Sequence, residues 1–282
     1  MWKFRYLLSL IPFLAAISPA SAMCLDNDAA CEVELGTYHI QRPADVEGQV
    51  PAVLFIHGYG GTGMGVMRNS GMIDAILARG YAVISPDGMP MDGQNGRSWS
   101  FNPLFAMRRD EASFIQSVRD DAGQNHGIDV DQILMAGFSI GGSLTSYLAC
   151  STPDAFAAYA PISGGFWRPQ PEECAGPVRL FHTHGWTDGT VPLEGRVLRN
   201  AELDGVSVEV AQGDIFRTME IWRSTNNCTQ YRADDFAIEG YYWRRSWARC
   251  EDGSALELAL FPGGHIIPQG WAKMALDWFE AL

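Results

Sequence analysis

The segment Asp131–Gly142 has the sequence DQILMAGFSIGG, in which a short apolar run, Ile133–Ala136, leads into a match to the pattern G-x-S-x-G at residues 137–141. An apolar run of this length is typical of a buried parallel strand. Residues 143–150, which follow, have a helical pattern. A strand, a tight turn with a central serine and a helix are the setting in which this pattern exposes a nucleophile. We therefore expect the hydroxyl of Ser139 to be a catalytic nucleophile.

The composition of the turn supports this interpretation. Gly137 and Gly141 suit it because a Cβ at either position would collide across the turn. A helix that starts after Ser139 would direct free backbone N–H groups, and the positive end of its dipole, at the serine. The alternative is a glycine-rich turn with an incidental serine, since a bare match to the pattern is common by chance. The flanking strand and helix favour the nucleophile.

The N-terminus has the pattern of a secretory signal peptide. Lys3 and Arg5 precede an apolar run over residues 6–17, and Ala20-Ser21-Ala22 comes next. The run has about a dozen residues, whereas a membrane-spanning helix needs about 20. We expect cleavage after Ala22 and secretion into the periplasm or the extracellular space. The remaining residues, 23–282, are enough for one α/β domain with a full core.

Composition limits the possible partners. The chain of 282 residues carries a net charge of −13, and Lys3 and Lys273 are its two lysines. Loss of the signal segment removes two positive charges and no negative ones, which gives −15. An acidic, lysine-poor surface argues against nucleic acids and anionic membranes as partners. We expect a small-molecule or oligomeric substrate, and composition leaves the oligomeric state open.

Six cysteines in an exported chain indicate three disulfides. The simplest of the 15 possible connectivities joins neighbours along the chain, namely Cys24–Cys31, Cys150–Cys174 and Cys228–Cys250. A metal site is the alternative, but the sequence has no C-x-x-C and no histidine at ligand spacing. We therefore expect no metal, and no motif implies an organic cofactor.

Apolar runs alternate with segments of helical spacing along the chain. The expected strands are residues 33–41, 50–56, 81–85, 133–136, 155–162, 178–183 and 256–261. The expected helices are residues 64–78, 110–124, 143–150, 191–203, 216–224 and 271–282. This alternation predicts an α/β fold with a mostly parallel central sheet, right-handed crossovers and helices on both faces.

Parallel sheets carry their chemistry at the carboxyl ends of the strands. Unusual clusters follow four of the expected strands, at residues 57–61, Ser139, residues 184–188 and His265. A serine nucleophile needs a base, and the base needs an acid that fixes its tautomer. His265 follows every candidate acid, as the chain order serine, acid, histidine requires. Asp188 directly follows a buried strand, so we expect Asp188 as the acid and His265 as the base.

Both assignments have ordinary alternatives. His265 would be a surface loop residue if the serine were incidental. The dipeptide Asp188-Gly189 is also a common turn, although the other candidate acids lie at expected helix ends or in polar loops.

An ester or amide intermediate needs two backbone N–H donors for its oxyanion. We expect these donors at Ile140, directly after the nucleophile, and at Tyr59, in the turn after an early strand. His57 precedes Ser139, so we expect it to shape this turn through hydrogen bonds and not to act as the base.

Several aromatic residues are candidates for a substrate pocket. Trp99, Trp167 and Trp186 lie in loops on the same side of the expected sheet, with core packing as the alternative. We expect the run Tyr241–Trp247 to form a hairpin that packs on the domain and is held by Cys228–Cys250. A polymer-binding platform is the other interpretation of this run.

Nearly the whole mature chain resembles the secreted polyhydroxybutyrate depolymerase and feruloyl esterase family of α/β-hydrolases. The resemblance rests on HGYGG at residues 57–61, PDG at 86–88 with Trp99 downstream, HGIDVDQILMAGFSIGG at 126–142, LACSTPDAFAAYAPISG at 148–164, HGWTDGTVP at 184–192 and PGGHIIP at 262–268. It implies an α/β-hydrolase fold with Ser139 as nucleophile, Asp188 as acid and His265 as base. The amides of Tyr59 and Ile140 then form the oxyanion hole, and Cys150–Cys174 and Cys228–Cys250 match pairs in the family.

Two positions depart from the family pattern. Ile140 stands where the family usually has alanine, which narrows the expected acyl pocket, and Tyr59 often corresponds to cysteine or glycine. Relatives that degrade solid polymer usually carry a further binding domain. Because this sequence ends at Leu282 with its closing helix, solid polymer is disfavoured as a substrate.

The expected activity is hydrolysis of carboxylic esters through an acyl-enzyme. Candidate substrates are feruloyl or acetyl esters of plant polysaccharide and short hydroxyalkanoate oligomers. A serine peptidase or an acyltransferase with the same triad is the alternative, because the fold alone does not determine the acyl acceptor. A binding protein without catalysis is disfavoured by the complete triad.

Overall fold

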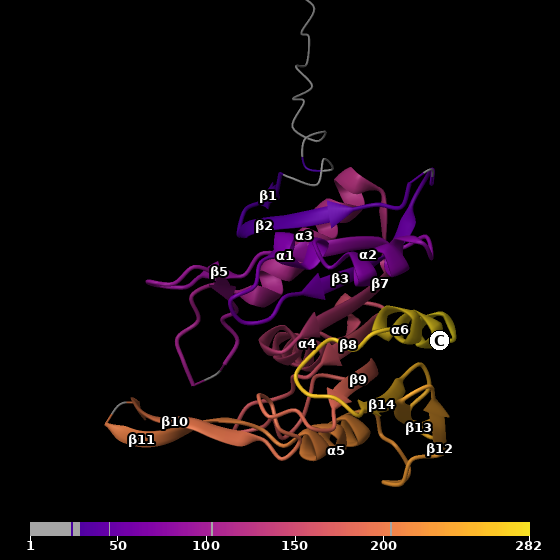
Figure 1. The fold of residues 1–282 in the computed structure, drawn as a ribbon. Coiled ribbons are helices and arrows are strands. Elements are labelled where there is room, and N and C mark those ends of the chain that lie inside the picture. Colours follow the sequence, from indigo (N-terminus) through magenta and orange to yellow (C-terminus); the bar gives the residue numbers. More distant parts are fainter. Residues whose placement is uncertain (1–23, 25–28, 45, 103, 204) are drawn as a thin grey trace, which may run out of the picture.

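The computed structural model is built around one large twisted sheet (Figure 1). It describes residues 24, 29–44, 46–102, 104–203 and 205–282. The expected signal peptide, residues 1–22, lies outside this part of the chain. No helix within the described residues is long and apolar enough to cross a membrane.

The strands are β1 (Cys31–Val33), β2 (Gly36–Gln41), β3 (Val50–Ile56), β4 (Ala82–Pro86), β5 (Met89–Pro90), β6 (Arg97–Ser98), β7 (Ile128–Phe138), β8 (Ala158–Ile162), β9 (Arg179–Gly185), β10 (Arg196–Leu203), β11 (Val206–Gln212), β12 (Asp235–Glu239), β13 (Tyr242–Trp247) and β14 (Ala255–Phe261). The α-helices are α1 (Gly63–Met67), α2 (Ser70–Leu77), α3 (Glu111–His126), α4 (Ile140–Ser151), α5 (Ile215–Thr225) and α6 (Trp271–Glu280), and Pro153–Ala155 forms a 3-10 turn.

The main sheet is parallel in its centre and antiparallel at its edges. Its strand order is β1-β2-β4-β3-β7-β8-β9-β14-β13-β12. The strands from β4 to β14 in this order are parallel, whereas β1, β2, β12 and β13 pair antiparallel. The segments that follow β3, β7, β9 and β14 therefore leave the sheet at the same edge. These segments carry Tyr59, Ser139, Asp188 and His265.

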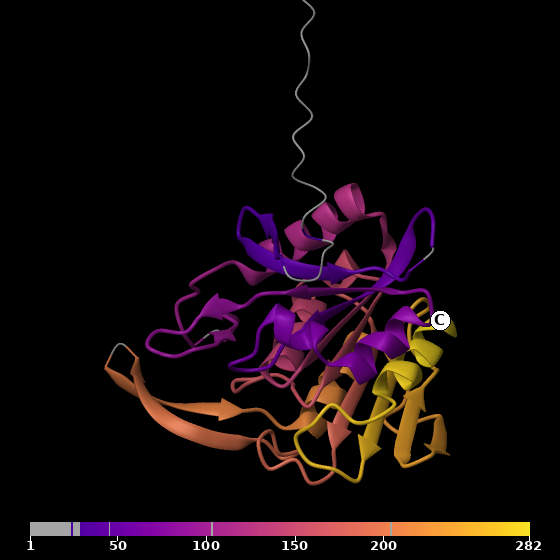
Figure 2. The ribbon, with the colours of Figure 1, turned by 45° about the horizontal axis from the view of Figure 1, so that its top comes forward.

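Helices cover both faces of the sheet (Figures 1 and 2). On one face, Phe114 of α3, Leu144 of α4 and Trp222 of α5 belong to the same buried cluster. On the other face, Ile73 of α2 and Trp278 of α6 belong to a second cluster. Burial on both faces explains why β3 is almost entirely apolar. The mostly parallel sheet with helices on both faces, as the sequence predicts, is confirmed.

One expected helix, residues 191–203, is wrong. This segment instead leads into the antiparallel hairpin β10–β11, which projects from the body of the protein (Figure 2). The sequence contains the hairpin signal, because Asp204-Gly205 is a dipeptide typical of a two-residue turn. Gly205 has a φ of +77°, which glycine adopts without strain. Val197, Leu198 and Leu203 lie on strand β10, whereas the buried Val191 and Leu193 precede it, so these residues do not form one helical face.

Two other elements differ in detail from their expected form. The expected helix 64–78 is divided into α1 and α2, and Asn69 occupies the N-cap position of the second helix without a side-chain capping bond. The expected strand 33–41 is a short hairpin of β1 and β2. The helix that was expected at 216–224 is present as α5. The run Tyr241–Trp247 supplies the second strand of the hairpin β12–β13, and this strand also pairs with β14.

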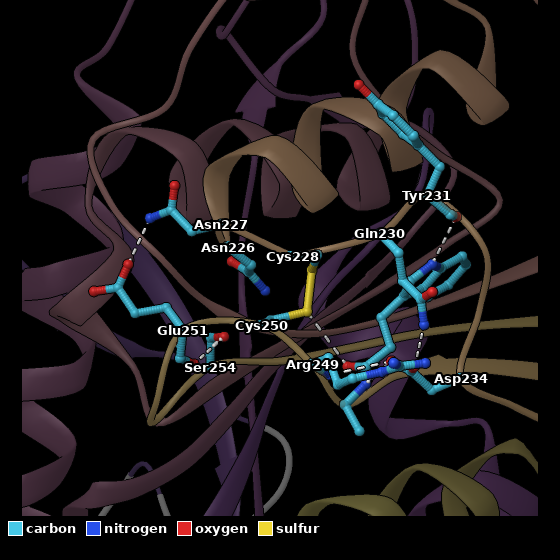
Figure 3. The surroundings of a disulfide bond; sticks show 12 residues. Asn226, Asn227, Cys228, Gln230, Tyr231, Asp234, Arg249, Cys250, Glu251 and Ser254 are labelled. Atoms are coloured by element: carbon cyan, nitrogen blue, oxygen red, sulfur yellow. Dashed lines mark hydrogen bonds and ion pairs between the residues drawn. A yellow bond between two sulfur atoms is a disulfide. The ribbon is translucent and has the colours of Figure 1, made fainter.

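The three disulfides join the expected pairs, Cys24–Cys31, Cys150–Cys174 and Cys228–Cys250. Figure 3 shows the last of these, which links the end of α5 to the segment after β13. Beside it, the Asn226 side chain is fully buried and exchanges two 2.9 Å hydrogen bonds with the backbone of Val178. The disulfide and Asn226 together attach α5 to the beginning of β9.

Removal of the Cys228–Cys250 bond in a Cys228→Ser/Cys250→Ser variant is expected to lower the free energy of unfolding by about 3 kcal/mol. The reason is that the bond closes a loop of 22 residues in the unfolded chain. Urea denaturation of the oxidised proteins measures the loss. The matched control is Cys150→Ser/Cys174→Ser, which opens a loop of similar length, 24 residues, and should lose a similar amount. An unchanged denaturation midpoint would contradict the prediction.

Candidate active site

Ser139 lies between the end of β7 and the start of α4 in a conformation that few residues adopt. Its φ and ψ angles are 59° and −122°. Such a backbone costs about 1–3 kcal/mol and persists only where its surroundings hold it. The Ser139 N–H donates to the Ile162 carbonyl at 2.9 Å, and its carbonyl accepts from the Ser143 N–H at 2.9 Å. The turn therefore has the strained geometry that the sequence predicts.

Close backbone approaches leave no room for side chains around this turn. A Cβ on Gly137 would lie 2.4 Å from the Gly141 carbonyl oxygen, and a Cβ on Gly141 would lie 2.4 Å from the Ile56 carbonyl oxygen. A Cβ on Gly164 would lie 2.2 Å from the carbonyl oxygen of Ser139. The first two glycines belong to the expected motif. Gly164 was not singled out, because its neighbour is brought in by tertiary structure.

The structure brings Ser139, Asp188 and His265 together. The Nε2 atom of His265 lies 2.8 Å from the Ser139 hydroxyl, and its Nδ1 atom lies 2.7 Å from Asp188 Oδ2. A carboxylate only accepts, so Nδ1 carries the proton and Nε2 is free to accept the hydroxyl proton. This is the relay that a serine nucleophile needs.

The loops that carry Asp188 and His265 are joined by their backbones. Thr187 N–H donates to the Gly263 carbonyl at 2.9 Å, and Trp186 N–H donates to the Phe261 carbonyl at 2.8 Å. The spacing between acid and base is therefore set by neighbouring strands, β9 and β14, and by the two hydrogen bonds that continue their pairing.

The Asp188 carboxylate is buried and fully engaged. Its Oδ1 accepts the Thr190 and Val191 N–H groups at 2.9 and 2.8 Å, while Oδ2 accepts from His265. Burial alone would raise the pKa of Asp188. The hydrogen bonds from His265 and from the Val191 amide, together with nearby imidazoles, outweigh burial and lower this pKa. Asp188 therefore stays ionised beside the imidazole.

The two expected oxyanion donors flank the serine. Ile140 begins α4 directly after Ser139. On the other side, a Cβ on Gly58 would lie 3.4 Å from Ser139 Cβ, which puts the turn carrying Tyr59 beside the nucleophile. Within the described residues, neither the Tyr59 nor the Ile140 amide donates a hydrogen bond. Both N–H groups are thus available to a substrate oxygen.

The side chain of His57 stabilises the turn that carries Tyr59. Its Nδ1 donates to the Gly58 carbonyl at 2.8 Å, and its Nε2 accepts the Gly88 N–H at 3.0 Å. Trp99 donates its indole N–H to the His57 carbonyl at 2.8 Å. Burial lowers the pKa of His57, so the neutral imidazole that this pattern requires is favoured. The structure thus gives His57 the loop-shaping contacts that the sequence predicts.

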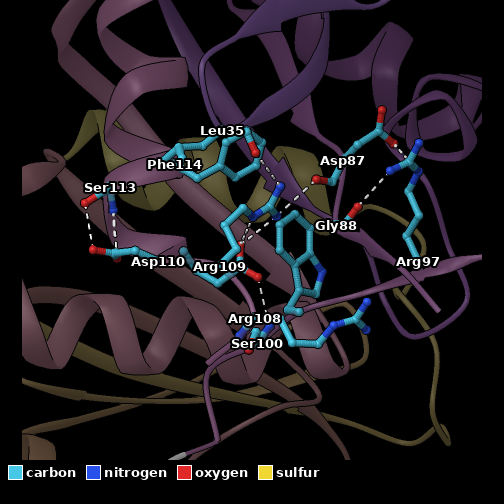
Figure 4. Close-up of polar contacts among 12 residues, drawn as sticks. Leu35, Asp87, Gly88, Arg97, Ser100, Arg108, Arg109, Asp110, Ser113 and Phe114 are labelled. Carbon is cyan, nitrogen blue, oxygen red and sulfur yellow. Dashed lines mark hydrogen bonds and ion pairs between the residues drawn. The ribbon is translucent and has the colours of Figure 1, made fainter. Parts of the chain in front are cut away.

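A buried ionic network continues from this turn (Figure 4). Arg97 donates to the Gly88 carbonyl at 2.9 Å, and Arg109 donates to the Asp87 carbonyl at 3.2 Å. The Asp87 carboxylate accepts the Gly63 N–H at 2.9 Å. Burial would raise the pKa of Asp87, but hydrogen bonds, first among them one from His39, lower it to about 2. In the sequence, PDG contributes only to the family resemblance, and its role as an anchor depends on contacts with distant segments that the sequence does not reveal.

The three candidate pocket tryptophans have different surroundings. Trp99 is buried against His57. Trp167 is partly buried and directs its indole N–H at the Ser143 hydroxyl, 3.4 Å away. Trp186 is 55 % exposed and packs edge-on against Trp243 with ring centres 6.2 Å apart. It borders a pocket of about 640 Å³ on β12 and β13, so this part of the hairpin is open where we expected packing.

A second pocket, of about 250 Å³, borders the nucleophile turn. The Phe138 ring in its wall lies 4.8 Å from the His265 ring, centre to centre. Its apolar character fits the acyl part of an ester. The pocket is lined in part by Phe55, Gly58, Val66, Met72, Phe138 and Ile267.

One group of potential metal ligands occurs among the described residues. It consists of Cys24, Cys31 and His126, whose ligand atoms lie within 4.8 Å of one another. Both sulfur atoms are bonded to each other, so they do not offer the thiolates that a metal requires. The disulfide pairing predicted from the sequence accounts for this cluster.

The family model for phospholipases and carboxylesterases matches residues 36–219, which include the expected nucleophile and acid. The chain belongs to this family. Feruloyl esterase D of Neurospora crassa is 27% identical over 157 residues, which cover 54% of this chain and 48% of the relative. Poly(3-hydroxyalkanoate) depolymerase C of Paucimonas lemoignei is 26% identical over 181 residues, which cover 61% and 41%. The match thus spans about half the length of these relatives or less.

A solved structure shares the fold over most of its length. The acetyl xylan esterase from Aspergillus awamori superimposes with a TM-score of 0.64 at 16% identity. The match covers 87% of this chain and 94% of that chain. The sheet order, the helices on both faces and this likeness identify the α/β-hydrolase fold, as the sequence resemblance implies.

Stability is expected to fall when the pH is lowered from 7.5 to 5.5, because the fold buries neutral histidines. Burial lowers the pKa of His57, His182 and His184. In the unfolded chain these histidines have a pKa near 6.5, so below that pH the unfolded chain binds protons that the folded chain does not. Each histidine that stays neutral in the fold then costs about 1.4 kcal/mol at pH 5.5. Urea denaturation at the two pH values measures this; equal stabilities would refute it.

Proposed function

We propose that this member of the phospholipase/carboxylesterase family hydrolyses carboxylic esters through an acyl-enzyme. Ser139 is the nucleophile and His265 is the general base. Asp188 is the acid whose carboxylate orients the His265 imidazole. The single observation that carries the proposal is the continuous hydrogen-bonded path from Asp188 through His265 to Ser139, with lengths of 2.7 and 2.8 Å. This path ends at a serine in a strained turn beside two free amides, which is the arrangement that acyl transfer needs.

Each step follows from these positions. The Ser139 oxygen attacks the ester carbonyl while its proton moves to His265 Nε2. The carbonyl oxygen becomes an oxyanion that accepts from the Tyr59 and Ile140 amides. Collapse breaks the C–O bond to the alcohol, and the alcohol leaves with the proton from His265. Water then attacks the acyl-enzyme in the same way, and the carboxylic acid and free Ser139 are regenerated.

The names of the relatives suggest the substrate class. They include feruloyl esterases and a poly(3-hydroxyalkanoate) depolymerase. We propose feruloyl or acetyl esters of plant polysaccharide, or short hydroxyalkanoate esters, as substrates of this chain. The apolar pocket beside the nucleophile is the place for the acyl group, and Trp186 is a candidate contact for the rest of the substrate.

We also propose that the protein is exported. The sequence over residues 1–22 has the signal-peptide pattern. The three disulfides support this proposal, because such bonds persist in oxidising compartments outside the cytoplasm.

Ser139→Ala should abolish ester hydrolysis, with a loss of at least about 10³-fold in kcat, because no other group replaces the nucleophile. Hydrolysis of methyl ferulate, of p-nitrophenyl acetate and of a soluble hydroxybutyrate trimer is the measurement. Ser146→Ala is the matched control, since Ser146 lies on the same helix and its hydroxyl, within the described residues, hydrogen-bonds to the Gly142 carbonyl alone. Turnover that survives in folded Ser139→Ala would overturn the nucleophile.

Labelling by a fluorophosphonate probe separates the chemistry from the choice of ester. The native protein should be labelled at Ser139 and the Ser139→Ala variant should not. Labelling without turnover of the three esters would leave the serine mechanism in place and exclude these acyl groups. Absence of both labelling and turnover would contradict the proposed activity.

A further inference from the structure

Two histidines that the proposed mechanism does not use lie behind the catalytic acid. His182 and His184 are on β9, and both side chains are completely buried. Their rings are stacked, with centres 5.3 Å apart and planes 6° from parallel. His184 Nε2 lies 2.8 Å from the Val191 carbonyl oxygen and 3.6 Å from Asp188 Oδ2. Complete burial of two polar rings costs free energy unless the rings are hydrogen-bonded, so their partners decide whether the pair is stable.

The partners determine which nitrogen of each ring carries a proton. A carbonyl oxygen only accepts, so His184 Nε2 must be protonated to bond Val191. The neutral ring then has a bare Nδ1, which lies 3.1 Å from His182 Nε2. His182 must therefore donate from Nε2 to His184 Nδ1. A single direction of donation results, from His182 to His184 to Val191.

Val191 connects this chain of donors to the acid. Its carbonyl accepts from His184, while its N–H donates to Asp188 Oδ1 at 2.8 Å. The loop from Asp188 to Val191 is therefore held through two backbone groups of Val191, its carbonyl and its N–H. With Oδ1 held by the loop amides, Oδ2 is the atom that faces His265.

We propose that the His182–His184 pair is a positioning device for the catalytic acid. His182 keeps His184 in the Nε2–H tautomer, and His184 anchors the Asp188 loop through Val191. The inference rests on the proposed function, because it assigns these residues a part in the same triad. Neither histidine touches the substrate or the reacting atoms, so both are positioning residues.

The charges around the pair agree with this role. The titratable groups that face His184 are His182, Asp188 and His265, and within the described residues His182 faces His184 alone. Burial lowers the pKa of both rings, so both remain neutral where the acid is ionised. The Nε2–H group of His184 donates to Val191 and lies 3.6 Å from Asp188 Oδ2, beyond hydrogen-bond distance, so it does not compete with His265 for this oxygen.

The first test needs no variant. Nitrogen-15 NMR of protein labelled at histidine reports which ring nitrogen of each residue is protonated. We expect the Nε2–H tautomer for both His182 and His184 at neutral pH. Assignment of the Nδ1–H tautomer to His184 would overturn the proposal, because that ring has no proton to donate to Val191.

The second test compares variants that keep or remove the donor. His184→Leu removes it, whereas His184→Gln retains an amide N–H at a similar reach. We expect His184→Leu to lower kcat by about 10- to 100-fold with little change in KM, as a misplacement of about 1 Å does. His184→Gln should recover part of this loss. His182→Leu and His182→Gln should differ in the same direction.

The pH profile separates positioning from a general loss of packing. A carboxylate that turns away no longer stabilises the imidazolium form of His265. The acid limb of kcat/KM should therefore move to lower pH in His184→Leu and not in the control Thr183→Val. Thr183 is the buried residue between the two histidines, and its hydroxyl has no partner among the described residues.

The outcomes distinguish the inference from the function that it extends. If folded His184→Leu keeps the native kcat and pH profile while Ser139→Ala is inactive, the positioning role is wrong and the triad stands. If Ser139→Ala retains activity, the proposed function fails first. If His184→Leu does not fold, the tautomers measured in the native protein decide the question.

Discussion

The structure depends on the close approach of backbones at the carboxyl ends of its central strands. Ser139 keeps its strained conformation because the end of β8 bonds to its N–H and glycines on three sides allow the chain to come within contact distance. Any side chain at Gly137 or Gly164 would separate these segments. The strained backbone of Ser139 is thus maintained by packing that extends well beyond the turn, and the sheet core supplies the rigidity that holds it.

The same principle places the other functional groups. The proposed acid and base, Asp188 and His265, follow neighbouring parallel strands, and two backbone hydrogen bonds continue the pairing of β9 and β14 into their loops. The turn that carries Tyr59 is stabilised by side chains instead of by strand pairing. Its conformation is fixed by hydrogen bonds of His57 and Trp99 and by the network around Asp87. A glycine-rich turn needs such contacts, because glycine restricts the backbone less than other residues do.

Local patterns in the sequence are sufficient to predict the strand, turn and helix around Ser139 and to select Asp188 and His265 as candidates. The strand, turn and helix around Ser139 are contiguous, and the order serine, acid, histidine selects His265 without any knowledge of distances. The ribbon β10–β11 differs from the expected helix because the turn at Asp204-Gly205 and the pairing of β10 with β11 determine the conformation of this segment. Gly164, Asp87 and the His182–His184 pair were missed for another reason. Their importance arises from contacts between segments far apart in the chain, which no local pattern encodes.

The ribbon has a consequence for motion near the site. β9 is buried in the centre of the sheet. Most of β10 is exposed, and within the part of the chain that the structure describes it pairs with β11 alone. A lone two-stranded ribbon is marginally stable in water. Amide hydrogens of β9 therefore exchange with solvent only on global unfolding, while those of the ribbon exchange through frequent local opening. The change from slow to fast amide exchange then falls across the loop of Asp188, which joins β9 to β10.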